Sequence, residues 1–341
     1  MRASVIVTGG AGFIGSNWVR LALQRSDLER LVVLDKLTYA GNLANLAGLD
    51  DDPRFRFVQG DIADAAAVES LVQREPVDAI VNFAAESHVD RSVLDPSAFL
   101  RTNVHGVYVL LEACRAHGVR RFLQVSTDEV YGAVLTGRST ERDPLAPRSP
   151  YSAAKAAGDL LALSYHATYG LDVVVTRGAN TIGPYQYPEK ATPLFITNAI
   201  DGEPLPIYGD GKAIRDYLHV EDHCRAIALA LEAGQSGEVY NIGNDEEIDT
   251  LTLADAILSL LDRPRSLIRL VEDRPGHDRR YAVDSTKLRA LGWRPERDFR
   301  ATIAATVEWY RQNERWWRPI RNGEFREFYR RLYGKRLGLV D

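Results

Sequence analysis

The feature that most constrains this chain is the glycine-rich segment Thr8–Gly15, which reads TGGAGFIG and directly follows a run of β-branched residues. Gly9, Gly12 and Gly15 have the spacing of a turn between a strand and a helix, where the absence of side chains lets the backbone approach a pyrophosphate. The amides at the N-terminus of the following helix would hold that anion. The segment therefore predicts the start of a dinucleotide-binding fold, although a purely structural glycine turn is an alternative.

An acidic residue stands where this kind of fold binds a ribose. Asp35 ends a second strand-like run about twenty residues beyond the glycine turn, and its carboxylate would accept hydrogen bonds from the adenosine hydroxyls. The same charge would repel a 2′-phosphate, so the sequence favours NAD over NADP as cofactor. Asp61 follows a third strand-like run and is placed to meet the adenine ring. Both acids could instead simply cap a helix.

The first half of the chain alternates strand-like and helix-like segments. Short apolar runs rich in β-branched residues cover 4–8, 31–35, 55–59, 79–83, 121–126 and 171–176. Stretches with apolar residues at helical spacing lie between them, among them Ala98–His117 and Ser152–Tyr169. Strand, helix and strand repeated in this way predict an α/β fold of the Rossmann type, a doubly wound parallel sheet with helices on both faces.

The pattern changes after Gly178. Prolines crowd the segment 184–206, shorter elements follow, and we predict a Trp- and Arg-rich last helix near Val307–Trp317 whose tryptophans pack the lobe. We expect an NAD-binding Rossmann domain over residues 1–178, with a return segment around 213–242. Residues 179–341 would form a smaller α/β C-terminal lobe that binds the substrate.

Composition excludes several classes of protein. The 341 residues carry a formal net charge of −5, the wrong sign for a chain that coats nucleic-acid phosphates. No run approaches the roughly 20 apolar residues of a membrane-spanning helix, and the glycine-rich start is unlike a signal peptide, so we expect a cytoplasmic protein with no membrane partner. Cys114 and Cys224 lie far apart, and no His, Asp or Glu cluster has metal-ligand spacing, so we predict neither a disulfide nor a metal site.

A tyrosine and a lysine at helical spacing are the first candidates for catalysis. Tyr151 and Lys155 stand at positions i and i+4 of an expected helix after the fifth strand, so their side chains share one face. A nearby ammonium group stabilises a phenolate, and we therefore expect a lowered pKa that lets Tyr151 act as a base. Such a pair also arises by chance, and its position in a nucleotide-binding fold is what makes it significant.

Together with the glycine turn and Ser126 at the end of the fifth strand, this pair resembles the extended short-chain dehydrogenase/reductase family, whose members commonly act on nucleotide sugars. The triplet Thr127-Asp128-Glu129 is similar to that of the dTDP-glucose 4,6-dehydratases within the family. Further similar segments span the chain: 85–90 (AESHVD), 183–190 (GPYQYPEK), 205–209 (LPIYG), 214–216 (IRD) and 274–278 (RPGHD). One departure is Thr181-Ile182, where many members have Asn-Tyr.

The resemblance implies an NAD-dependent hydro-lyase that removes a hydride from sugar C4, eliminates water across C5 and C6, and returns the hydride to C6. Tyr151 would take the proton of the C4 hydroxyl, supported by Lys155 and Thr127. Glu129 would be the base at C5, and Asp128 the acid at the C6 hydroxyl. Two carboxyl groups with separated pKa values suit these roles. Their alternative role is to cap the turn after a strand.

The resemblance also implies which residues bind the cofactor and the substrate. Besides Tyr151 and Lys155, the residues expected to contact NAD are Gly9, Gly12, Phe13, Ile14, Gly15, Asp35, Lys36, Thr38, Asp61, Ile62, Phe83, Ala84, Ala85, Ser87, Thr102 and Thr181. Those expected to contact the nucleotide sugar are Ser87, Thr127, Asn180, Glu189, Lys190, Pro206, Tyr208, Arg215, Asn241, Arg274 and His277.

The family usually forms homodimers through the helix that carries Tyr151 and the one near 98–117, so a homodimer is expected. The product would enter deoxysugar biosynthesis, for rhamnose or for a secondary-metabolite sugar. Four alternatives stay open: a 4,6-dehydratase for another nucleotide, a 4-epimerase, a decarboxylase, and a non-catalytic NAD-sensing module.

Overall fold

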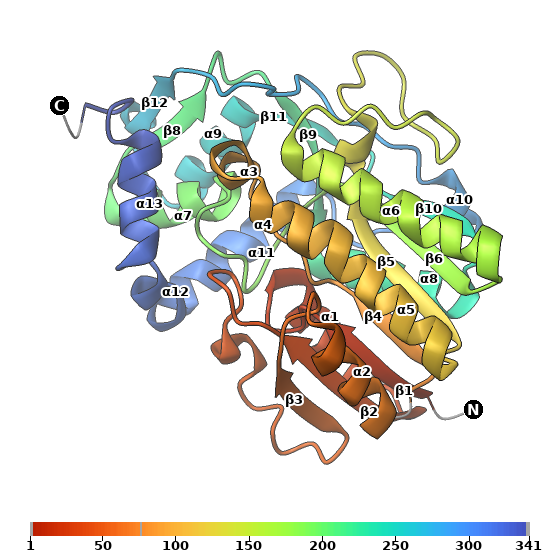
Figure 1. Cartoon of the computed structure of the whole chain (residues 1–341). Helices are drawn as coiled ribbons and strands as arrows, with labels where there is room; N and C mark the ends of the chain where they lie inside the picture. The colour runs from red at the N-terminus through yellow and green to blue at the C-terminus, as the bar shows by residue number, and fades with distance from the viewer. Residues whose placement is uncertain (1–2, 76, 339–341) are drawn as a thin grey trace.

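The computed structural model describes residues 3–75 and 77–338 and is built around one seven-stranded sheet (Figure 1). Every neighbouring pair of its strands is parallel, in the order β10-β6-β5-β4-β1-β2-β3. Its strands are β1 (Ala3–Thr8), β2 (Leu28–Asp35), β3 (Phe55–Gln59), β4 (Ala79–Asn82), β5 (Arg121–Thr127), β6 (Asp172–Gly178) and β10 (Glu238–Ile242). The predicted doubly wound parallel sheet is confirmed.

Alternating side chains divide each central strand between two layers of helices. In β1, Val5 and Val7 face a core that includes α1 and α8, whereas Ile6 faces the opposite core with α2, α5 and α6. The helices on the two faces are α1 (Phe13–Leu23) and α8 (Val220–Ala233) on one side, and α2 (Ala65–Arg74), α5 (Val107–His117) and α6 (Pro150–Tyr169) on the other. Burial of both faces explains why these strands are nearly continuous apolar runs in the sequence.

The order of the strands reverses at β1. The chain first builds β1, β2 and β3 in one direction and then crosses to β4 on the other side of β1. In open α/β sheets a ligand binds at such a switch point, beyond the carboxyl ends of the strands, because the loops diverge there. In this protein the diverging loops are the glycine turn after β1 and residues 83–88 after β4.

The long helix predicted before β5 has an irregular first half. α3 (Val89–Leu94) and α4 (Ser97–Leu100) are followed by a π-helical segment, Arg101–Gly106, which continues directly into α5. Asn103 in this segment accepts the Glu86 amide and donates to the Glu86 carbonyl, at 2.9 Å each. The widened turn therefore fixes the loop after β4 at the switch point, in keeping with the frequency of π-helical turns at functional sites.

Most of the chain beyond Gly178 forms a smaller lobe, coloured green to blue in Figure 1. Its strands are β7 (Asn180–Ile182), β9 (Ile214–His219) and β11 (Glu247–Asp249) in one sheet, and β8 (Leu205–Tyr208) and β12 (Ile268–Val271) in another. Its helices are α7 (Ala191–Asp201), α9 (Thr250–Leu260), α11 (Phe299–Gln312), α12 (Glu314–Ile320) and α13 (Glu324–Tyr333). α8, β10 and α10 (Thr286–Ala290) belong instead to the layers of the large sheet. The domain boundary at residue 178 stays a prediction, and residues 1–2 and 339–341 of the predicted ranges lie outside the described residues.

The Trp- and Arg-rich helix predicted near Val307–Trp317 is two helices rather than one. α11 and α12 are separated at Asn313, which leaves the helical conformation with φ −116° and ψ 39°. Neither is the last described helix, which is α13. Trp317 is fully buried in the core of the lobe and donates its indole N–H to the Tyr310 carbonyl at 2.8 Å, so its predicted packing role is confirmed.

Candidate active site

A cavity of about 210 Å³ opens at the switch point of the large sheet, and we refer to it as the cofactor pocket. Its walls come mainly from the glycine turn and from the loops that follow β2, β3 and β4, and a further part comes from the segment 186–190 of the smaller lobe. Of the residues predicted to contact NAD, those that line it are Gly9, Gly12, Phe13, Ile14, Gly15, Asp35, Lys36, Thr38, Asp61, Ile62, Phe83, Ala84, Ala85, Ser87 and Thr102. The fold thus gathers segments that are far apart in the sequence around one space.

The glycine turn has no space for a side chain at Gly9 or Gly15. A Cβ atom on Gly15 would lie 2.3 Å from the Gly9 carbonyl oxygen, and one on Gly9, whose φ is +69°, would lie 2.5 Å from the Ala84 amide nitrogen. α1 begins after Gly12, which has no side chain with which to cap the first amides of the helix. A helix N-terminus carries unpaired N–H groups and a partial positive charge. The turn therefore fits the pyrophosphate of a dinucleotide.

Asp35 and Asp61 present carboxylates to the cofactor pocket. Asp35 Oδ2 accepts the Ala11 amide at 2.9 Å, and its Oδ1 accepts the Leu37 amide at 2.8 Å. Burial raises the pKa of Asp35, and these two bonds oppose the rise. Asp61 Oδ2 pairs with Lys36 at 2.9 Å, while its Oδ1 accepts a backbone amide two residues further on, so this residue also caps a turn. A carboxylate fixed by backbone amides is a rigid acceptor for ribose hydroxyls, so the pocket suits NAD.

A second cavity, of about 280 Å³, adjoins the cofactor pocket, and we call it the substrate pocket. It draws residues from both the large sheet and the smaller lobe. Of the residues predicted for catalysis and substrate binding, those that line it are Ser87, Thr127, Asp128, Glu129, Tyr151, Asn180, Glu189, Lys190, Pro206, Tyr208, Arg215, Arg274 and His277. Thr181 and Tyr151, which were predicted to contact NAD, line this pocket rather than the first, and Lys155, predicted to contact NAD as well, lines neither. The two pockets share a wall made of Phe13, Ile14, Ser87, Gln186, Glu189 and Lys190.

Tyr151 and Lys155 lie one turn apart near the start of α6. Lys155 is buried and donates its Nζ to the Val125 carbonyl at 2.6 Å, and burial lowers the pKa of Lys155 to about 8. The pKa of Tyr151 is raised well above its usual value, first by burial and then by the Glu129 carboxylate, while a hydrogen bond with Thr127 acts in the opposite direction. The lowered phenol pKa predicted from the sequence is therefore wrong for this structure, because the lysine is bound to a backbone carbonyl and the buried phenol faces a carboxylate.

The two acids that follow β5 differ in their environment. Asp128 is 3% exposed, and burial, reinforced by the Glu129 carboxylate, raises the pKa of Asp128 to about 8. Its Oδ1 accepts the Thr127 hydroxyl at 3.2 Å, and its Oδ2 has no hydrogen-bond partner among the described residues. Glu129 is half-buried and also lines the substrate pocket. Near neutral pH, Asp128 is therefore mainly protonated and able to give up a proton.

Arg215 and Arg274 reach the substrate pocket from the smaller lobe, and the protein holds both in place. Arg215 donates to two backbone carbonyls, at 2.7 and 3.0 Å. Arg274 Nη1 pairs with Asp90 Oδ1 at 3.1 Å, and Asp90 Oδ2 accepts the Tyr208 hydroxyl at 3.3 Å. One buried carboxylate thus fixes both an arginine and a tyrosine. The planar guanidinium groups match the oxygens of a diphosphate.

Comparison with known proteins assigns the chain to one family. The family model described as GDP-mannose 4,6 dehydratase matches residues 6–306. A dTDP-glucose 4,6-dehydratase of Streptomyces niveus is 53% identical over 323 residues, which cover 93% of this chain and 96% of the relative. The chain belongs to this family of nucleotide-sugar dehydratases. The resemblance to the dTDP-glucose 4,6-dehydratases, predicted from the sequence, is confirmed.

Solved structures agree with the sequence comparison. The crystal structure of DesIV, a dTDP-glucose 4,6-dehydratase from Streptomyces venezuelae with NAD and TYD bound, is 51% identical and has a TM-score of 0.90, covering 93% of this chain and 99% of that chain. The UDP-glucose 4-epimerase of Thermus thermophilus, in complex with NAD, has a TM-score of 0.85 but is 34% identical, covering 91% and 99%. The fold is thus shared with an epimerase, whereas sequence identity places the chain among the dehydratases.

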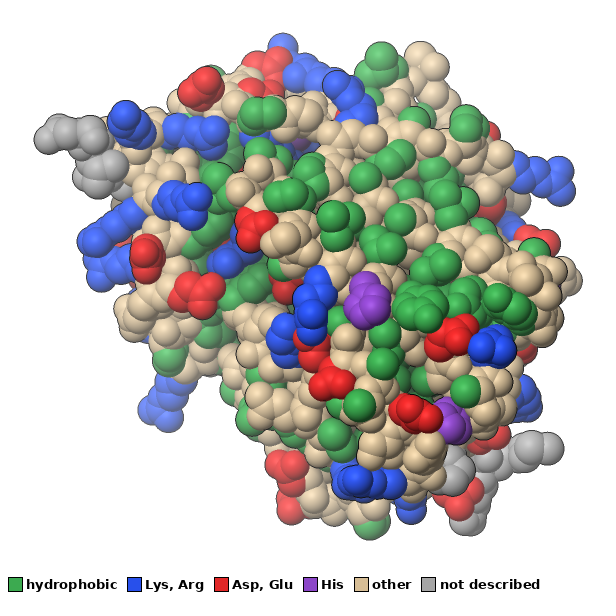
Figure 2. Space-filling model, in the orientation of Figure 1, with side chains coloured by type: hydrophobic (Ala, Val, Ile, Leu, Met, Phe, Trp, Pro, Cys, Tyr) green, Lys and Arg blue, Asp and Glu red, His purple; other side chains and the backbone are tan. Residues whose placement is uncertain are grey.

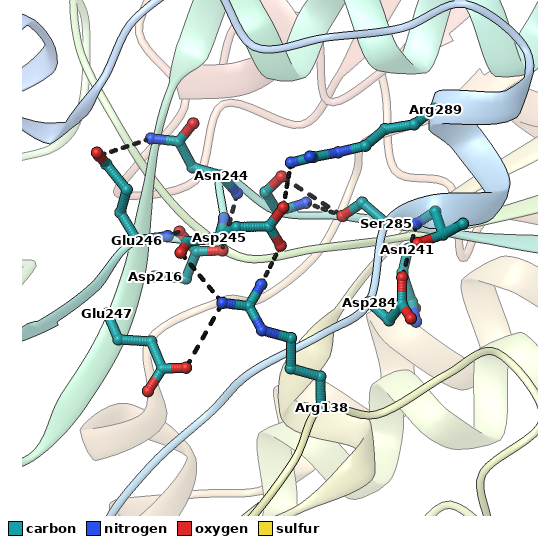
Figure 3. A network of polar contacts seen from close by, with 12 residues as sticks. Arg138, Asp216, Asn241, Asn244, Asp245, Glu246, Glu247, Asp284, Ser285 and Arg289 are labelled. Atoms are coloured by element: carbon teal, nitrogen blue, oxygen red, sulfur yellow. Dashed lines mark hydrogen bonds and ion pairs between the residues drawn. The ribbon is translucent and has the colours of Figure 1, made fainter.

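Asn241, predicted to contact the substrate, lines neither pocket, and this prediction is corrected. The buried amide donates to the Ser139 carbonyl at 3.0 Å and accepts the Tyr131 hydroxyl at 2.8 Å. Figure 3 shows Asn241 at the side of a polar network around Asp216 and Asp245. The Asp216 carboxylate accepts three successive backbone amides of the loop after β10, at 2.8 to 3.3 Å. Asn241 therefore supports the loop that follows the two acids rather than contacting a ligand.

Sequence reasoning missed several residues that line the pockets. Tyr39 lines the cofactor pocket, and Asp90, His223, Tyr281 and Tyr333 line the substrate pocket. Of these, Asp90 stands in a segment that resembles the family, and the others have no local pattern that could have identified them. Within 3–75 and 77–338 there is no group of three or more His, Cys, Asp or Glu side chains that could hold a metal ion, and no helix there is long and apolar enough to cross a membrane.

Proposed function

We propose that this protein is a dTDP-glucose 4,6-dehydratase, which converts dTDP-glucose to dTDP-4-keto-6-deoxyglucose and water with NAD as a regenerated cofactor. The observation that carries the proposal is the pair Asp128 and Glu129 in the substrate pocket, because burial keeps the first of them protonated near neutral pH. Elimination of water needs an acid and a base at neighbouring carbons, and epimerisation at C4 does not. The identity of 53% to a dTDP-glucose 4,6-dehydratase supports the choice of nucleotide.

The first proton is removed at the C4 hydroxyl. NAD, held by the glycine turn and by the loops after β2, β3 and β4, would accept a hydride from the sugar and give it back within one turnover. Tyr151 takes the C4 hydroxyl proton, and Thr127 stabilises the phenolate by a hydrogen bond. The Glu129 charge opposes this ionisation, so cations must offset it. Lys190 Nζ lies 5.8 Å from the Tyr151 ring centroid, and Lys155 lies one helical turn away.

The elimination uses the two acids together. Glu129 takes the proton from C5, which the adjacent 4-keto group makes acidic, while Asp128 gives its proton to the departing C6 hydroxyl and so releases water. Glu129 then returns its proton to C5. The proton that Tyr151 removed from the C4 hydroxyl replaces the one that Asp128 lost. All three side chains therefore end the turnover in the state in which they began.

The remaining lining residues bind and orient the nucleotide sugar. Arg215 and Arg274 would pair with the diphosphate, and Pro206 and Tyr208 would line the pocket of the base. Ser87, Asn180, Glu189 and Lys190 would contact the hexose. His277, whose ring centroid lies 6.1 Å from that of Tyr208, would lie beside the base.

The test is a panel of nucleotide glucoses. The purified protein is incubated separately with dTDP-, UDP-, GDP- and CDP-glucose without added reductant, and proton NMR is used to look for the C6 methyl doublet of a 4-keto-6-deoxy sugar. We expect the doublet with dTDP-glucose alone. A doublet with a different nucleotide would keep the reaction and change the substrate. Bound NAD with no doublet from any of the four would contradict the proposed reaction.

We also propose that the protein is a cytoplasmic homodimer joined through α5 and α6. Figure 2 shows hydrophobic side chains gathered over these helices, and Tyr108, Leu160 and Tyr169 are 44%, 57% and 55% exposed. Contiguous exposed apolar surface marks protein interfaces.

The cytoplasmic location is supported by the two cysteines, since the buried free thiols of Cys114 and Cys224 fit a reducing compartment. The dimer is tested separately. Light scattering should give the mass of a dimer for the wild type and of a monomer for Leu160→Glu, and a monomeric wild type would contradict the interface.

A further inference from the structure

The last described helix, α13, lies beside the substrate pocket, although the family model stops at residue 306. Phe325, Tyr329 and Tyr333 are spaced by four residues, so they share one face of the helix. Phe325 and Tyr333 are only 3% and 6% exposed, and they pack with Leu194 of α7 in a small apolar cluster. α13 is therefore packed against the smaller lobe, and Figure 1 shows it next to α7.

Tyr333 adds an aromatic ring to the part of the substrate pocket that contains Arg274. It lines the pocket there together with Pro206, Tyr208 and His277. Its ring centroid lies 5.9 Å from that of Tyr208, and the Arg274 guanidinium lies 5.7 Å from the Tyr208 centroid. Two neighbouring rings beside an arginine offer a flat apolar surface to a base and a cation to the diphosphate attached to it.

Arg91 of α3 fixes the first turns of α13. Its guanidinium lies 4.3 Å from the Phe328 ring centroid and 3.8 Å from that of Tyr39. Its Nη1 pairs with Glu324 at 3.3 Å, and its Nη2 pairs with Glu189 at 2.9 Å. Tyr39 lines the cofactor pocket and Glu189 lines both pockets. The position of α13 is thus tied to the walls around both ligands.

We propose that Tyr333 contacts the base of the nucleotide sugar, and that Phe328 is a positioning residue that holds α13 against Arg91 so that Tyr333 keeps its place. This inference rests on the proposed function and deepens it. A base stacked on an aromatic ring is bound equally in the ground state and in the transition state. Loss of the ring should therefore raise KM and leave kcat unchanged.

The test compares variants of the full-length, NAD-loaded protein. Tyr333→Ala should raise the KM for dTDP-glucose and the Kd for dTDP roughly tenfold, with kcat unchanged. Tyr333→Phe keeps the ring and should bind dTDP nearly as the wild type does. Phe328→Leu should raise the Kd, but it should add nothing in a double variant with Tyr333→Ala, because it acts through that ring. Arg330→Gln changes an exposed residue of the same helix and serves as the matched control.

Calorimetric titration with dTDP measures this binding without turnover. Wild-type affinity in Tyr333→Ala would overturn the inference, and so would additive effects in the double variant. A loss of affinity in the Arg330→Gln control would also overturn it, because general disturbance of α13 would then explain every variant. A wild-type protein that binds dTDP but dehydrates no nucleotide glucose would refute the proposed function and leave the contact with the base intact.

Discussion

Replacing Asp128 by asparagine should remove the acid for the elimination, and with it one limb of the pH profile. Burial and the Glu129 carboxylate raise the pKa of Asp128 to about 8. The active, protonated form is therefore present below pH 8 and is lost as the pH rises through that value. Well above this pKa the wild-type dehydration rate should fall about tenfold for each pH unit.

The expected size of the effect follows from the chemistry that is lost. An asparagine amide has nearly the same shape as the carboxyl group but cannot supply a proton to the C6 hydroxyl. Positioned general acids contribute about 10²- to 10⁴-fold, so kcat should fall by that factor, which is ~3–5 kcal/mol of barrier. The affinity for the nucleotide sugar should stay near that of the wild type, because the amide fills the same buried site.

Initial rates of methyl-doublet formation, measured by proton NMR on both sides of this pKa, provide the assay. Lys155 is the competing explanation for a descending limb, since burial also lowers its pKa to about 8 and its positive charge disappears above that pH. The asparagine variant separates the two, because it retains Lys155. A descending limb that persists in Asp128→Asn, together with an undiminished rate at lower pH, would refute the assignment of Asp128 as the acid.

Three further outcomes follow from the geometry. Gly15→Ala should purify with little bound NAD, because the new Cβ would lie 2.3 Å from a carbonyl of the same turn, and a nucleotide content equal to that of the wild type would contradict this. Asp90→Asn should raise the KM for the nucleotide sugar about tenfold with kcat unchanged, since Arg274 loses its charged partner. A drop in kcat alone would argue against a role of Arg274 in substrate binding. Asp159→Asn should lower the free energy of unfolding in urea by about 3–5 kcal/mol, because Arg177, 3% exposed and 3.0 Å from that carboxylate, would be left buried without a counter-charge. An unchanged midpoint of urea unfolding would contradict this expectation.

The sequence could predict the parts of the site that lie at strand ends. The glycine turn, Asp35, and the acids Asp128 and Glu129 each directly follow or end a parallel strand, and parallel strands bring their carboxyl ends to one edge of a sheet. Their positions at strand ends were therefore enough to predict that these residues lie close together. The strands themselves were recognisable because burial on both faces makes them continuous apolar runs.

What the sequence could not predict depends on contacts between distant segments. Asp90 and Arg274 are 184 positions apart, so no local pattern links them. The spacing of Tyr151 and Lys155 suggested a lowered pKa for Tyr151. The pKa of Tyr151 is instead raised, because the phenol is buried and faces the Glu129 carboxylate. Asn241 lies in a buried polar network instead of the pocket, because the loop after the two acids packs against it.

The wall shared by the two pockets has a consequence for how the enzyme acquires its cofactor. An occupant of the substrate pocket covers side chains such as Ser87, Glu189 and Lys190 that also border the dinucleotide, and so it obstructs exchange. A reaction that returns its hydride in every turnover has no need of exchange. We therefore expect a bound nucleotide sugar to slow the release of NAD. Enzyme that carries NAD when it is purified should then complete many turnovers without added cofactor.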